Sequence, residues 1–112
     1  MLFLVLIYQD EAKMAAATAD EQQTIGRDYG EFNTFLAESG ALRGTATWPA
    51  GVSTIRSHDG KALVTEGSYQ AAGDRVAGFF LIEVADMVAA IEFARRVPGV
   101  QYGGVEIRPV QG

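Results

Sequence analysis

The two longest apolar runs of the chain, Leu2–Tyr8 and Ala77–Val84, predict strands at the centre of a sheet. Both runs have the length of a strand, and both place branched or aromatic side chains at consecutive positions. Because successive side chains of a strand point to opposite faces of the sheet, each run presents apolar residues to both faces. We therefore expect both faces of this sheet to need cover.

Two segments have the periodicity of amphipathic helices that pack against such a sheet. The first begins at Thr18, which can form a capping box with Glu21, and Ser39-Gly40 supplies its stop. The second begins after Asp86, a common N-cap residue, and Pro98-Gly99 is expected to end it. The expected core positions are Ile25, Tyr29, Phe32 and Leu36 in the first helix, and Met87, Ala90, Ile91 and Ala94 in the second.

A β-hairpin is predicted between the two helices. Its strands are Val52–Ser57 and Lys61–Thr65, and the turn between them is His58-Asp59-Gly60, because Gly accepts the positive φ of a tight turn. Leu42–Trp48 and Val105–Pro109 are shorter strand candidates. The predicted order is therefore strand, helix, strand, hairpin, strand, helix, strand.

This order of elements predicts one α+β domain over residues 1–112, with a ferredoxin-like antiparallel sheet, two helices on one face and an inserted β-hairpin. Two helices can cover only one face of the sheet. Leu2–Tyr8 has apolar residues at both odd and even positions, which point to opposite faces of the sheet. This predicts that the other face packs against a second copy of the chain. The expected assembly is a homodimer in the form of a dimeric α+β barrel.

Composition and charge narrow the range of partners. Of the 112 residues, 48% are hydrophobic and 21% are charged, which is typical of a folded domain, and the formal net charge is −5. The nine basic residues are scattered, so we expect no direct nucleic-acid binding and no binding to an anionic membrane. The chain has no cysteine, which fits the reducing cytoplasm, and the apolar Met1–Tyr8 is too short to span a bilayer.

The single histidine has two interpretations. His58 and Asp59 could act as an acid–base pair, or they could simply belong to a solvated turn, which needs Asp59 for its geometry. One histidine without cysteine gives no zinc spacing, so no metal site is predicted. No glycine-rich phosphate motif lies between a strand and a helix, and no cofactor is expected.

The candidate ligand site surrounds the polar segment Glu66–Arg75, which leads from the hairpin into the second long strand. Glu66 is the candidate acid–base or accepting group, and Arg75 would hold an anionic or carbonyl group. The alternative is that Glu66 and Arg75 form an exposed ion pair of little energetic weight. The candidate ligand-binding residues are Tyr8, Asp10, Trp48, Glu66, Tyr69 and Arg75.

Four segments, in this order, resemble the YCII-related, DGPF-domain family: Leu4–Glu11, Asp59–Tyr69, Gly78–Val84 and Val105–Pro109. The resemblance implies a ferredoxin-like fold and usually a homodimer, in bacterial cytosolic proteins that are mostly uncharacterised. A few relatives of this kind are lyase-like or dehalogenating enzymes that use a His/Asp pair. DGPF-type members are often encoded beside, or fused to, extracytoplasmic-function sigma factors.

Two differences from the family pattern bear on function. Glu66-Gly67-Ser68-Tyr69 stands where the family has Asp-Gly-Pro-Phe, and His58 lies at the hairpin turn rather than near the first helix. Three classes of function stay open. The first is binding of a small molecule, with cofactor-independent catalysis as an extension. The second is a regulatory interaction module that partners a sigma factor, and the third is a structural subunit without a ligand.

Overall fold

The computed structural model describes residues 1–47, 51–69 and 73–111. Its helices are α1 (Glu11–Ala16), α2 (Ala19–Ser39) and α3 (Met87–Ala94), followed by a short 3-10 helix, η1 (Pro98–Tyr102). Its strands are β1 (Leu2–Asp10), β2 (Leu42–Thr47), β3 (Ser53–His58), β4 (Lys61–Glu66), β5 (Asp74–Glu83) and β6 (Gly103–Val110). The predicted order of strands and helices is confirmed, and α1 is an additional short helix that the sequence pattern did not reveal.

Four strands form an antiparallel sheet in the order β2-β5-β1-β6. The two strands with the longest apolar runs, β1 and β5, lie at its centre, where strands are covered most completely. In the register, Val5 lies opposite Phe80 on one side and opposite Ile107 on the other. This strand order and the two β-α-β connections confirm the predicted α+β, ferredoxin-like fold.

The helices begin where their caps predict. The Thr18 hydroxyl accepts the Glu21 amide at 3.1 Å, the Glu21 carboxylate accepts the Thr18 amide at 3.2 Å, and α2 ends at Gly40 with φ 75°. At α3, the Asp86 carboxylate accepts the Ala89 amide at 2.9 Å, a single N-cap hydrogen bond. Pro98-Gly99 was expected to end α3; the helix ends a few residues earlier, at Ala94, and Pro98 begins η1.

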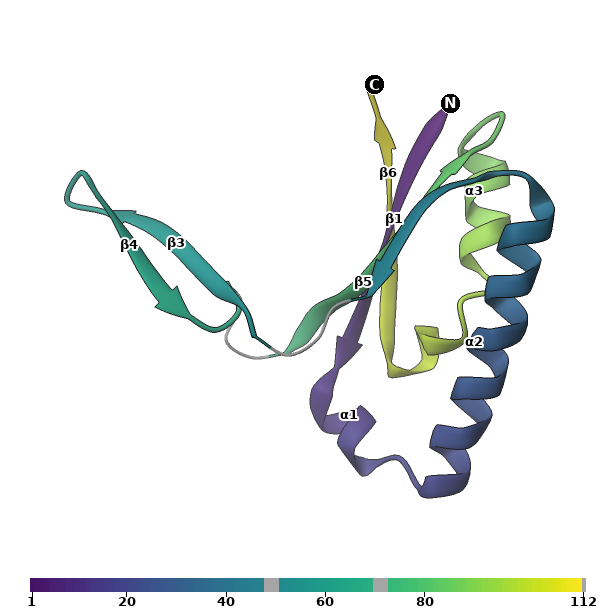
Figure 1. Ribbon diagram of the computed structural model, residues 1–112, viewed down its shortest axis with the longest axis horizontal. Coiled ribbons are helices and arrows are strands. Elements are labelled where there is room, and N and C mark those ends of the chain that lie inside the picture. The colour runs from purple at the N-terminus through teal and green to yellow at the C-terminus, as the bar shows by residue number, and fades with distance from the viewer. Residues whose placement is uncertain (48–50, 70–72, 112) are drawn as a thin grey trace.

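Both long helices cover the same face of the sheet (Figure 1). Alternate residues of β1 and β5 face them, and Phe32 packs edge to face on Phe80 with 5.5 Å between ring centroids. The residues buried in this layer include Phe3, Val5, Phe80 and Ile82 from the strands and Phe32, Leu36, Ala90 and Ala94 from the helices. Met87, expected in the core, is 36% exposed, because it lies in the first turn of α3.

We call the opposite side of the sheet the open face. It carries the other alternate residues of β1 and β5, chiefly Leu4, Leu6, Phe79 and Leu81, all of them partly exposed. In Figure 1, neither α2 nor α3 lies on this side. Within the described part of the chain, the sheet is thus covered on one face only.

The predicted hairpin is present as a separate two-stranded sheet of β3 and β4, which we call the arm. Its turn has positive φ at Asp59 (51°) and Gly60 (76°), as a tight hairpin turn of this sequence requires. The arm extends away from the helices and the main sheet (Figure 1). It is joined to the main body through the chain on either side of it.

Candidate functional site

The base of the arm brings together several of the predicted ligand-binding residues. In the sheet register, Arg75 lies opposite Gln9 and Val76 opposite Tyr8, so the segment that leaves the arm runs beside the C-terminal end of β1. Two surface hollows lie here. One, of about 720 Å³, is lined by Gln9, Glu11, Glu66, Arg75 and Ala77 among others. The other, of about 740 Å³, includes Tyr8, Val52, Ile55, Tyr69, Arg75 and Val76.

Arg75 lines both hollows, and its ion-pair partner differs from the predicted one. Its Nη1 atom lies 3.1 Å from Oε1 of Glu11 in α1, whereas the expected partner was Glu66. Glu66 lines one hollow together with Arg75. Since Arg75 and Glu11 are both partly exposed, their ion pair adds little to stability but fixes the direction of the guanidinium group.

Three further candidates have other surroundings. Asp10 accepts the amides of Ala12 and Lys13 and so serves as the N-cap of α1. The ring of Tyr69 lies 4.0 Å from the guanidinium of Arg56 on the arm, a cation–π contact. Trp48 lies outside the described residues. The ligand role of all six candidates stays a prediction.

The open face carries a polar cluster around Tyr8. Its hydroxyl donates to Oε2 of Glu106 at 3.2 Å, and Arg108 binds both oxygens of the same carboxylate at 3.1 and 3.2 Å. The hydrogen bonds from Arg108 lower the pKa of Glu106, while burial and the Glu106 charge raise the pKa of Tyr8. The cluster is thus a neutral tyrosine and a satisfied ion pair at neutral pH.

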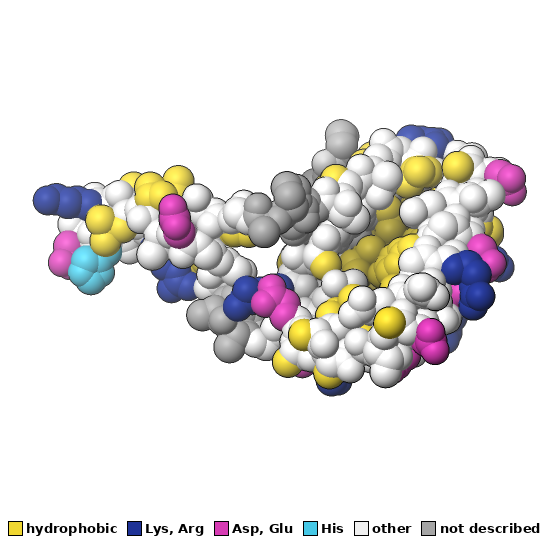
Figure 2. All heavy atoms as spheres, turned by 60° about the horizontal axis from the view of Figure 1, so that its bottom comes forward, with side chains coloured by type: hydrophobic (Ala, Val, Ile, Leu, Met, Phe, Trp, Pro, Cys, Tyr) yellow, Lys and Arg dark blue, Asp and Glu magenta, His cyan; other side chains and the backbone are white. Residues whose placement is uncertain are grey.

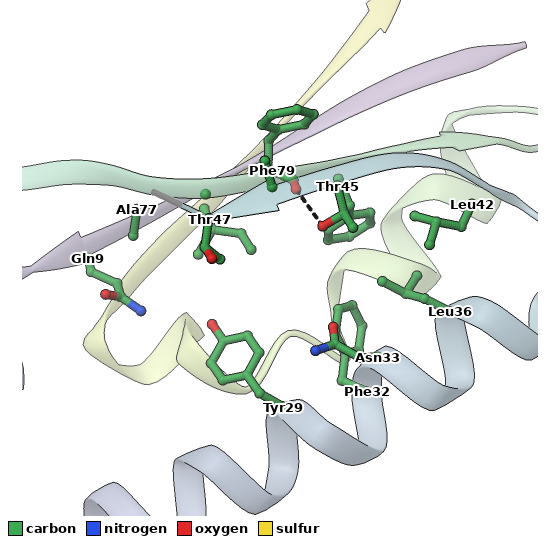
Figure 3. Close-up of a pocket in the computed structure, with 14 residues that line it drawn as sticks. Gln9, Tyr29, Phe32, Asn33, Leu36, Leu42, Thr45, Thr47, Ala77 and Phe79 are labelled. Atoms are coloured by element: carbon green, nitrogen blue, oxygen red, sulfur yellow. Dashed lines mark hydrogen bonds between the residues drawn. The ribbon is translucent and has the colours of Figure 1, made fainter. Parts of the chain in front are cut away.

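A more enclosed cavity lies on the other side of the sheet, between α2 and the strands β2 and β5. This cleft has a volume of about 450 Å³. Its lining is mostly apolar and includes Ile7, Phe32, Leu36, Leu42, Ala77 and Phe80. Its polar groups come from Gln9, Tyr29, Asn33, Thr45 and Thr47 (Figure 3). Figure 2, which brings the bottom of Figure 1 forward, shows hydrophobic side chains on the floor of a hollow in the main body.

Tyr29 is the principal polar group of the cleft. In Figure 3 its hydroxyl points from α2 toward the sheet, on the side of Gln9 and Thr47. Burial raises the pKa of Tyr29, although hydrogen bonds to its oxygen from the Gly99 backbone and the Gln9 side chain oppose that rise. A Cβ atom on Gly99 would collide with the Tyr29 hydroxyl, so the absence of a side chain there lets the hydroxyl take its place. The phenol is neutral at pH 7 and can donate its proton.

The sequence profile of the YCII-related domain matches residues 1–111. This chain belongs to the YCII-related family. The family resemblance noted in the sequence is thereby confirmed. A relative of this YCII-related protein, "Uncharacterized protein R00369" of Rhizobium meliloti (strain 1021), is 29% identical over 114 residues, which cover 98% of this chain and 92% of the relative.

Sequence reasoning missed the cleft of the YCII-related protein for a physical reason. Tyr29 was predicted only as a core position of α2, and its hydroxyl was the one available sign that this position faces something polar. Thr45 and Thr47 are two positions apart in β2, so their side chains lie on the same face of the sheet, the one that the helices cover. Their proximity to Tyr29 depends on how α2 crosses the sheet, and no local pattern encodes that crossing.

Membrane-spanning helices and metal sites are absent from the described residues of the YCII-related protein. None of the helices within residues 1–47, 51–69 and 73–111 combines the length and hydrophobicity needed to cross a membrane. In the same ranges, no group of three or more His, Cys, Asp or Glu side chains is arranged to hold a metal ion.

Proposed function

We propose that this YCII-related protein binds a small, uncharged and largely apolar molecule in the cleft between α2 and the sheet. The observation that carries the proposal is the combination of a 450 Å³ cavity with an apolar wall and a few polar groups. Ligand pockets typically have volumes of about 300–1,000 Å³ and this kind of lining. Taking about 30 Å³ for each group the size of a water molecule, the cleft holds about 15 such groups.

The lining of the cleft determines the class of ligand. Among the described residues that line it, none is Asp, Glu, Lys, Arg or His, so nothing there would neutralise a charged ligand. Tyr29 is the ionisable residue, and its raised pKa keeps it protonated at neutral pH. The Gly99 backbone and the Gln9 side chain lie beside the Tyr29 oxygen and oppose the rise of its pKa, and the proton of the neutral phenol can be donated to an acceptor on the ligand. A carbonyl or ether oxygen meets this requirement, and the proposed activity is binding.

A matched pair of tyrosine variants tests the proposal. Uncharged aromatic and aliphatic ketones, esters and ethers of up to about 15 heavy atoms are screened for binding by ligand-detected NMR and then measured by calorimetry. Tyr29→Phe removes one hydrogen bond and retains the ring, so we expect the Kd of a hit to rise roughly tenfold. Tyr69→Phe makes the same change at the base of the arm and should leave the Kd unchanged. Equal affinity in the wild type and Tyr29→Phe would place the ligand outside the cleft.

The predicted residues at the base of the arm define a second place for a ligand, one with different chemistry. Arg75 and Glu66 line the same hollow, which suits an anionic or strongly polar molecule rather than an apolar one. Arg75→Ala and Glu66→Gln should weaken such a ligand in calorimetry, and both should bind the uncharged hits of the cleft like the wild type. Wild-type affinity for every anionic hit in both variants would remove this second location.

We also propose that the protein forms a homodimer through the open face. The central strands β1 and β5 place Leu4, Leu6, Phe79 and Leu81 there, and the described elements leave these residues partly exposed. Burying such a face in a second copy removes apolar area from water at a gain of about 25 cal/mol per Å². Sedimentation of a monomer at micromolar concentration would refute the dimer while leaving the cleft proposal intact.

A further inference from the structure

The arm makes the chain more extended than a domain of its length needs to be. The radius of gyration is 15.9 Å, whereas a compact domain of 112 residues has a value of about 13 Å. The overall dimensions are 48 × 40 × 19 Å, and Figure 1 shows the arm lying along the longest direction. An isolated two-stranded hairpin is marginally stable in water, so the arm requires a surface to pack against.

The two faces of the arm differ in chemistry. Ile55 lies directly across from Val64, and the pair shares one face with Ser57 and Ala62. Ile55 is 65% exposed and Val64 is 68% exposed. Arg56 lies across from Leu63, and these two occupy the opposite face. The Ile55 face is therefore apolar over its middle, while the Arg56 face already has a contact within the chain, because Arg56 stacks on Tyr69.

The 740 Å³ hollow at the base of the arm lies between the arm and the open face of the main sheet. Tyr8 and Val76, which lie opposite each other in the register, supply the sheet side of this 740 Å³ hollow, and Val52 and Ile55 supply the arm side. Figure 2 shows the arm standing off from the body, with hydrophobic side chains on its surface. The arm's outer part therefore cannot cover the open face of its own chain.

A second copy offers the surface that the arm lacks. The middle of its open face is apolar along β1 and β5, and so is the middle of the Ile55 face of the arm. The charged groups lie at the margins: Glu83 of the open face is paired with Arg43, and Glu66 lies at the base of the arm. Four strands present a planar area of about 500 Å² per copy, or about 1,000 Å² for two open faces in contact. An arm face of about 200 Å² that lies on the partner's open face covers part of that area and does not add to it, so the total stays at about 1,000 Å², the lower limit for a specific interface.

We infer that the β3–β4 hairpin is an intersubunit arm, whose Ile55 and Val64 side chains pack on the open face of a second copy of this chain. In a two-fold dimer each such contact is made twice. The inference rests on the homodimer proposed above and names the part of the chain that holds the two copies together.

The test distinguishes the contribution of the arm from dimer formation through the open face alone. Dimer dissociation constants are measured by sedimentation for the wild type, for the double variant Ile55→Ser/Val64→Ser and for Leu63→Ser, which makes the same kind of change on the opposite face of the arm. We expect the double variant to raise the Kd at least tenfold and Leu63→Ser to change it less than twofold. Because serine could loosen the hairpin, Val64→Thr, which keeps the branched shape, is measured as well and should raise the Kd severalfold.

The outcomes are distinct. A wild-type monomer would overturn both the dimer and the arm. A wild-type dimer whose Kd is unchanged in the double variant would overturn the arm alone, and so would an equal loss of affinity in Leu63→Ser. In support of the arm, amide hydrogens of Ser53–Glu66 should exchange more slowly at concentrations where the dimer forms than after dilution to the monomer. Equal exchange in the two states would contradict the inference.

Discussion

Replacing Phe80 with alanine tests whether the layer between the helices and the sheet is the stabilising core. Phe80 is 1% exposed, and its ring meets that of Phe32 at 5.5 Å with an interplanar angle of 63°. Truncating a buried Phe costs about 3–5 kcal/mol, from lost transfer free energy and the cavity left behind. The aromatic pair accounts for about 0.5–1.5 kcal/mol of that loss. Since Phe80 borders the cleft, water can enter the vacated space, so we expect about 3–4 kcal/mol.

Urea unfolding followed by circular dichroism gives this free energy for the wild type, Phe80→Ala and Phe80→Leu, all at one protein concentration. Phe80→Leu keeps an apolar side chain in the same place, so it should lose half as much stability or less. A loss below about 1 kcal/mol in Phe80→Ala, the range of surface substitutions, would refute the assignment of this layer as the core. The ligand hits of the cleft should also bind Phe80→Ala more weakly, because the ring lines the cavity.

Three further predictions concern local features. His58→Ala should change the free energy of unfolding by no more than about 0.5 kcal/mol, because 73% of the His58 side chain is exposed; a large loss in thermal unfolding would contradict the turn assignment. Gly60→Ala should cost about 1–2 kcal/mol, because φ is 76° there, and faster amide exchange in the arm would report it; unchanged exchange would argue against a strained turn. Hydrogen bonds from Thr18 lower the pKa of Glu21 below 4.5, so the stability that its carboxylate adds is complete above pH 4.5 and is lost as the pH falls through the lowered pKa. The stability difference between the wild type and Glu21→Gln should therefore shrink in acid, and a constant difference across that range would show that the charge is not involved.

The elements of this YCII-related protein could be predicted from the sequence because each depends on neighbours a few residues apart. The capping box joins Thr18 to Glu21, and the hairpin turn needs only Asp59 and Gly60 to take positive φ. The apolar runs of β1 and β5 likewise predicted central strands, because consecutive apolar side chains are typical of strands inside a sheet. The ferredoxin-like order then followed from the sequence of elements.

Relations between distant residues were decided by the tertiary structure. Arg75 pairs with Glu11 rather than with Glu66, because β5 runs beside the end of β1 and brings α1 within reach. The cleft exists because α2 crosses the sheet at a distance that leaves Tyr29 facing Thr47 across a gap. Local patterns encode which residues form a strand or helix, whereas the site depends on how those elements pack together in space.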